Sequence, residues 1–159
     1  MAVSDMPRWD VYPIKNRARG RLPVASIFDV NPTNLANATD GDFNTVTGTG
    51  NKTIVGVATL GRVAIDLGGI YNVHLRVKCG LWSTAGTVDA YSWGSTDNVT
   101  YYRISWKSLL QVIGQIAEYI IHNQIEFVRA RYLYMDFVGQ AAMTGYVKIY
   151  EIQAIDLGI

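Results

Sequence analysis

The sequence has few of the residues on which catalysis, disulfide scaffolds or nucleic-acid binding depend. It contains one cysteine, so no disulfide can form within the chain. Its two histidines, His74 and His122, accompany none of the metalloprotease or serine-hydrolase motifs. The 14 Lys and Arg residues almost balance the 13 Asp and Glu residues, so a net charge of +1 predicts neither nucleic acid nor membrane as a partner. These shortages exclude a disulfide scaffold and weigh against an enzyme.

Long apolar runs are also missing. Met1 is followed by Ala-Val-Ser-Asp, which does not resemble the apolar core of a signal peptide, and no later stretch is long enough to span a membrane. We therefore expect no signal peptide and synthesis in the cytoplasm, with incorporation into a larger particle such as a virion as one outcome.

Apolar residues make up 49% of the chain and aromatic residues 11%, which is typical of a globular protein of one domain at 159 residues. Several short segments alternate apolar and polar residues and end in Gly- or Asn-rich turns, as β-strands do. These segments are 63–67, 73–78, 88–93, 101–104, 131–137 and 146–152. The pattern predicts an all-β fold, a jelly-roll sandwich of two antiparallel sheets.

One segment supports two interpretations. Leu109, Ile113, Ile116 and Ile120 lie at helical spacing, which would make residues 107–119 an amphipathic helix. Gly114 weakens this interpretation, and the residues from 120 to 129 favour a strand again. The pattern leaves helix and strand open for residues 107–119.

Residues 1–21 differ in composition from residues 22–159, which we expect to form the sandwich domain. This N-terminal arm mixes basic and aromatic residues with little apolar periodicity, and it is either a solvated tail or a segment that docks on another subunit. Its aromatic residues favour docking. The candidate docking residues are Arg8, Trp9, Tyr12, Lys15, Arg17, Arg19 and Arg21.

A polar loop at residues 37–45 carries two carboxylates around a glycine, in the order Asp40, Gly41, Asp42, with Thr45 three residues later. Such a loop is often only a turn between strands. The same residues can also direct carboxylate and carbonyl oxygens at a hard cation such as Ca²⁺. Spacing alone leaves both interpretations open.

Four pieces of the sequence, in order, resemble the coagulation factor 5/8 type C family, the discoidin domains. The resemblance implies a galactose-binding-like β-sandwich, a fold shared with many bacterial carbohydrate-binding modules. Two positions depart from the family pattern, because Asn98 replaces a turn glycine and Tyr101 replaces a tryptophan. The matching pieces are the loop at 38–45, the strand at 62–68 that ends in Asp-Leu-Gly, the turn at 95–101, and the closing strands at 130–134 and 151–154.

The resemblance also implies a structural Ca²⁺ in the Asp-Gly loop. Its ligands in this chain would be Asp40, Asp42, Thr45 and Glu151, together with nearby carbonyl oxygens. This oxygen donor set is one that Ca²⁺ prefers. We expect the cation to rigidify the loop and to take no part in catalysis.

Glycan binding in such modules uses exposed aromatic rings and polar side chains in loops at one end of the sandwich. Trp82 lies in a segment, residues 80–86, that has the composition of a loop, whereas Tyr91 and Trp93 are expected to pack inside the sandwich. The candidate glycan-binding residues are Trp82, Arg76, Arg103, Tyr101 and Trp106.

The sequence thus predicts a non-enzymatic subunit of a larger assembly, such as a virion capsid, decoration or tail component. Its partners would be other protein subunits, in a homo-oligomer or larger particle, and its discoidin-like module would attach to a glycan or a cell surface. A stand-alone carbohydrate-binding, lectin-like module is the alternative. The two functions share one fold, and fold does not decide between them.

Overall fold

The computed structural model describes residues 15–110, 116–123 and 127–159. Within these ranges, nine strands join in one antiparallel hydrogen-bonded sheet, and a short 3₁₀ helix, η2 (Leu35–Thr39), precedes the Asp-Gly loop. No described helix is long and apolar enough to cross a membrane. The strands are β1 (Lys15–Asn16), β2 (Val24–Ser26), β3 (Gly50–Ile54), β4 (Ala58–Ser83), β5 (Thr87–Ser95), β6 (Tyr102–Leu110), β7 (Ala117–His122), β8 (Val128–Gly139) and β9 (Met143–Asp156).

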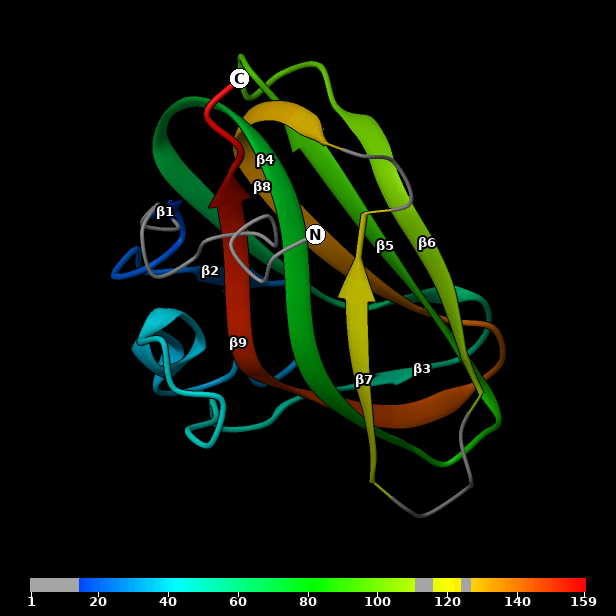
Figure 1. Ribbon diagram of the computed structural model, residues 1–159. Helices are drawn as coiled ribbons and strands as arrows, with labels where there is room; N and C mark the ends of the chain where they lie inside the picture. The colour runs from blue at the N-terminus through cyan, green and yellow to red at the C-terminus, as the bar shows by residue number, and fades with distance from the viewer. Residues whose placement is uncertain (1–14, 111–115, 124–126) are drawn as a thin grey trace, which may run out of the picture.

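The long strand β4 folds this sheet into a sandwich of two layers. Its first half pairs with β2 and β8, and its second half pairs with β9 and β7. Between the halves the register with β8 shifts from Asp66 to Tyr71, and Gly68 takes a positive φ of 80° that favours glycine. The β9 layer, with β7, β4 and β9 side by side, faces the viewer in Figure 1, and the β8 layer with β5 and β6 lies behind it.

The core lies between the two layers, because alternate residues of each strand point inward. Val73, Leu75 and Val77 of β4 are fully buried, as their alternation predicts, and Phe137 of β8 is fully buried as well. Burying one such side chain contributes about 1.5–3 kcal/mol. The all-β sandwich predicted from the sequence is confirmed.

The helical interpretation of residues 107–119 is wrong wherever the structure describes them. Residues 107–110 belong to β6 and residues 117–119 belong to β7, while residues 111–115 lie outside the described residues. Leu109 is fully buried, but Ile116 is 49% exposed and Ile120 39% exposed. Leu109, Ile116 and Ile120, the described residues at helical spacing, therefore do not share one buried face, and strand pairing decides which of them are covered.

The described part of the N-terminal arm, residues 15–21, lies on the domain. β1 pairs with the end of β9, and the Arg17 N–H donates to the Ala154 carbonyl at 2.8 Å. The Arg17 side chain forms an ion pair of 2.7 Å with Asp156 and lies 4.1 Å from the centre of the Tyr71 ring. Three predicted docking residues of the arm, Arg8, Trp9 and Tyr12, lie outside the described residues.

Candidate functional site

The Asp-Gly loop is organised by hydrogen bonds from its own backbone. It follows η2 directly, and Gly41 has a φ of 86°. The Asp42 N–H and the Thr45 hydroxyl donate to the two carboxylate oxygens of Asp40, at 2.8 and 2.7 Å. The Asn44 N–H donates to Asp42 Oδ1 at 2.8 Å. The Thr45 hydroxyl lowers the pKa of Asp40 below its usual value, because it stabilises the charged form.

Glu151 lies beneath this loop and is fully buried. Its Oε2 accepts a hydrogen bond of 3.2 Å from the Gly41 N–H, while its Oε1 has no partner among the described residues. Burial raises the pKa of Glu151 to about 7, and the nearby charge of Asp40 adds to the rise. Burying a carboxylate with one unpaired oxygen raises the free energy of the folded state. A bound proton or a nearby positive charge would therefore stabilise Glu151 in this position.

The predicted calcium ligands fit a hard cation by the chemistry of their donors. Asp40, Asp42 and Thr45 share one loop, and Glu151 reaches it from β9. Within the described ranges, however, no three His, Cys, Asp or Glu side chains already converge on one metal-binding point. The carboxylates of Asp40 and Asp42 are engaged with their own loop, so these residues provide the donor set without a preformed coordination shell.

The predicted glycan-binding residues divide between the two layers of the sandwich. Arg76 lies on β4, opposite Gln153 of β9 and His122 of β7. Trp82 also lies on β4, and its ring stacks on Tyr146 with the ring centres 5.2 Å apart. The prediction that residues 80–86 form a loop is therefore wrong for residues 80–83, because β4 continues to Ser83 through its pairing with β9.

The other three candidates lie at the β8 layer, together with aromatic residues from neighbouring strands. Trp106 of β6 is opposite Tyr91 of β5. Arg103 is opposite Trp93, which is itself opposite Tyr134 of β8. Directly opposed residues in an antiparallel sheet project to the same side. Strand register thus builds one outward-facing surface from Tyr91, Trp93, Trp106 and Tyr134, and the contact with Tyr134 adds Tyr101; we call this surface the aromatic face.

Four rings of the aromatic face form a contiguous row. Tyr91 and Trp93 have ring centres 6.5 Å apart, Trp93 and Tyr134 are 6.1 Å apart, and Tyr101 and Tyr134 are 4.8 Å apart. The prediction that Tyr91 and Trp93 pack inside the sandwich is wrong. Val88, Ala90 and Ser92 alternate along β5 and are fully buried, so Tyr91 and Trp93, at the positions between and after them, point outward.

An arginine–aspartate ion pair lies beside the aromatic face and gives it a charged side. Arg62 donates to both carboxylate oxygens of Asp136, at 2.6 and 2.9 Å. Its guanidinium also lies 4.0 Å from the centre of the Tyr134 ring. The hydrogen bonds to Asp136 raise the pKa of Arg62, which therefore stays charged. Sequence reasoning missed Arg62, Asp136 and Tyr134 as site residues, because only the register of β4, β8 and β5 places them beside Trp93.

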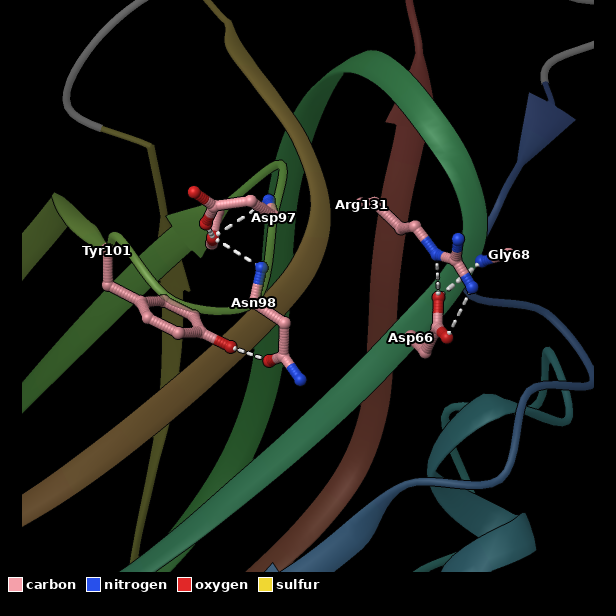
Figure 2. A network of polar contacts seen from close by, with 7 residues as sticks. Asp66, Gly68, Asp97, Asn98, Tyr101 and Arg131 are labelled. Atoms are coloured by element: carbon pink, nitrogen blue, oxygen red, sulfur yellow. Dashed lines mark hydrogen bonds and ion pairs between the residues drawn. The ribbon is translucent and has the colours of Figure 1, made fainter.

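Two segments that carry the family resemblance, one within β4 and one in the turn after β5, are held by side chains (Figure 2). Arg131 forms a two-pronged ion pair with Asp66, at 2.9 and 3.0 Å, so two of the resembling segments contact each other. Asp97 accepts N–H bonds from its own turn, which lower its pKa to about 2. Asn98 has a φ of 62° and accepts a hydrogen bond from the Tyr101 hydroxyl. Asparagine tolerates this conformation better than most residues, so it can stand where the family has glycine.

Solved structures with the same fold include several binding modules. CBM32-4 of Clostridium perfringens, in complex with GlcNAc-α-1,4-galactose, has a TM-score of 0.59 at 16% identity and covers 90% of this chain and 94% of its own. CBM32-3 of a family 31 glycoside hydrolase from the same organism has a TM-score of 0.55 at 15% identity, with the same coverage. A fucolectin from striped bass serum has a TM-score of 0.56 at 18% identity, and the match covers 91% of this chain and half of that one.

The sequence itself matches no protein-family model and no curated protein significantly. At these identities the structural likeness establishes the fold and leaves the ligand undetermined. The chain therefore has the discoidin-like, galactose-binding-like β-sandwich fold, as a divergent example.

Proposed function

We propose that this chain is a carbohydrate-binding module that binds its ligand on the aromatic face. One observation carries the proposal: a row of aromatic rings lies on the outside of the β8 layer, beside the charged Arg62–Asp136 pair. Trp106, which extends this face on β6, is 44% exposed. Flat rings pack against the C–H surfaces of sugars, and charged groups bind the hydroxyls.

Trp82 provides a weaker platform than the aromatic face. Its ring is nearly parallel to that of Tyr146, at 11°, so Tyr146 covers one side of the indole. At most one side is left for a ligand. The aromatic face combines more rings with Arg62, Asp136 and Arg103, which can bind a sugar's hydroxyl groups.

We also infer that Ca²⁺ binds in the Asp-Gly loop, with Asp40, Asp42, Thr45 and Glu151 as ligands. The support is the buried Glu151 Oε1, which lacks a partner among the described residues. A divalent cation would neutralise this carboxylate and tie β9 to the loop. Its contribution is to stability, so chelation should lower the melting temperature without altering which sugar is bound.

The comparisons favour the binding module over the assembly subunit. The similar structures named above are binding modules or lectins by their descriptions, which also agrees with a non-enzymatic role. A role within a particle, with other subunits as partners, would require docking by the N-terminal arm. Deleting residues 1–14 and measuring the mass of the particle in solution tests that role.

A glycan array followed by calorimetry on the full chain tests the proposed function. We expect Trp106→Ala to weaken binding of the best ligand about tenfold, the loss of roughly one aromatic contact. Val55→Ala, at a side chain that is 97% exposed and is not part of the aromatic face, serves as the control and should bind normally. Full binding by Trp106→Ala together with loss in Trp82→Ala would move the site to the β9 layer.

A further inference from the structure

The β9 layer carries a groove that the proposed function does not use. It is an open cavity of about 1090 Å³ on the outer face of the layer, and four of its lining side chains are basic or imidazole groups: Arg19, Arg76, His74 and His122. Gln153 and Asn16 add amide groups, while Phe43, Ile120, Ile155 and Leu157 provide apolar walls. We call this cavity the basic groove.

Strand register brings these side chains together. His74 and Arg76 alternate with the fully buried Leu75 on β4, so both project outward. His122 of β7 is opposite Arg76, and its ring lies 6.1 Å from that of His74, centre to centre. Arg19 comes from the N-terminal segment, and its guanidinium lies against the backbone of Gly41.

The charged side chains that line the groove are of one sign, positive. Among the residues that the structure describes, no Asp or Glu lines this cavity. Asp40 and Glu151 lie near Arg19 and offset part of its charge. Arg76 makes no ion pair or side-chain hydrogen bond within the described residues. A guanidinium in this position has its donors available for a planar or tetrahedral anion.

The basic groove adjoins a second cavity at the edge between the two layers. This second cavity of about 210 Å³ lies between β6 and β7, and it shares Ile120 and His122 with the groove. Trp106 and Lys107 line its other side, and no Asp or Glu lies among the described residues that line it. A chain-like ligand could therefore contact Arg76, pass His122 and, by turning over the edge between β7 and β6, reach Trp106.

We propose that the basic groove binds the carboxylate or sulfate group of an acidic saccharide, with Arg76 as its main anchor. This inference rests on the proposed function, because it takes the ligand of the aromatic face to extend across β7. The guanidinium of Arg76 and the amide of Gln153 would hold the anionic group. The apolar walls at Ile120 and Ile155 would contact the C–H surface of the sugar ring.

The test compares matched saccharides by calorimetry on the full chain at about 0.15 M salt, where long-range attraction is largely screened. The probes are a chondroitin sulfate hexasaccharide, its desulfated counterpart, a neutral N-acetylglucosamine hexamer and inorganic sulfate. The variant is Arg76→Gln. Its control is Lys148→Gln, which removes one positive charge from β9 outside the groove.

We expect the acidic hexasaccharides to bind more tightly than the neutral hexamer. Arg76→Gln should weaken acidic binding at least tenfold, the value of roughly one hydrogen bond to a charged group, and leave neutral binding unchanged. Equal loss in Lys148→Gln would mean general charge attraction and would overturn the inference.

Two further outcomes separate this inference from the proposed function. If the neutral and acidic hexasaccharides bind equally well, the acidic specificity is wrong and the carbohydrate-binding module stands. If inorganic sulfate competes at the same concentration as the sulfated saccharide, the groove is a site for free anions and the inference fails. If a folded protein binds no saccharide on the array or in solution, both proposals fail.

Discussion

The stability of this protein should fall as the pH rises through neutrality, and Glu151 is the reason. Its side chain is fully buried, and its pKa is raised from 4.5 to about 7. Below about pH 4.5 the carboxyl is protonated in both the folded and the unfolded chain. Between the two pKa values the folded protein holds a proton that the unfolded chain has lost, so the folded state is progressively disfavoured.

The size of this loss of stability follows from the shift in the pKa of Glu151. Each pKa unit corresponds to 1.36 kcal/mol, so a rise from 4.5 to about 7 represents about 3 kcal/mol of lost stability above neutral pH. Glu151→Gln removes the charge and keeps the acceptor for the Gly41 N–H. We expect this variant to be about 1–3 kcal/mol more stable than the wild type near pH 8, with a flat profile from about pH 5 upward.

Urea unfolding at a series of pH values, with chelator present, measures this profile. Glu118→Gln on β7 is the matched control, because the Glu118 side chain is exposed. This variant should show the same slope of unfolding free energy against pH as the wild type. Adding Ca²⁺ should restore the stability of the wild type near pH 8 and do little for Glu151→Gln. A flat wild-type profile, or a Gln variant that is less stable near pH 8, would refute the reasoning.

Three further predictions concern the turns and the close packing of the sheet. Asn98→Ala should destabilise the fold by about 1 kcal/mol, and Asn98→Gly should be nearly neutral, because the φ of 62° strains a residue with a Cβ; urea unfolding of both variants decides this. The pKa of Asp97 is lowered to about 2, so its turn should be stable above about pH 4 and loosen as the pH falls toward 2, which hydrogen exchange at Thr100 would reveal. Gly61→Ala places a Cβ 2.0 Å from the Phe28 ring, so a loss of about 1–3 kcal/mol is expected, and an unchanged melting temperature would contradict this packing.

The elements of the fold could be predicted because they depend on short-range patterns. Alternating apolar residues such as Val73, Leu75 and Val77 indicate a strand with one buried side wherever it is placed. Residues 107–119 could not be assigned, because Leu109 and Ile116 lie at helical spacing while Gly114 and the strand-like residues from 120 onward weigh against a helix. Pairing of β6 with β5 and of β7 with β4 resolved the described part of that segment in favour of strands.

The candidate sites were only partly predictable, for a physical reason. The Asp-Gly loop is local, so Asp40, Asp42 and Thr45 could be grouped from their spacing alone, and the family resemblance added Glu151. The aromatic face and the basic groove depend on register, which places Arg62 beside Asp136, 74 residues later, and His74 beside His122. Sequence by itself determined which segments are strands and turns. Only the tertiary structure decided which side chains share a face, because a shift of one residue in pairing would turn each of them to the opposite side.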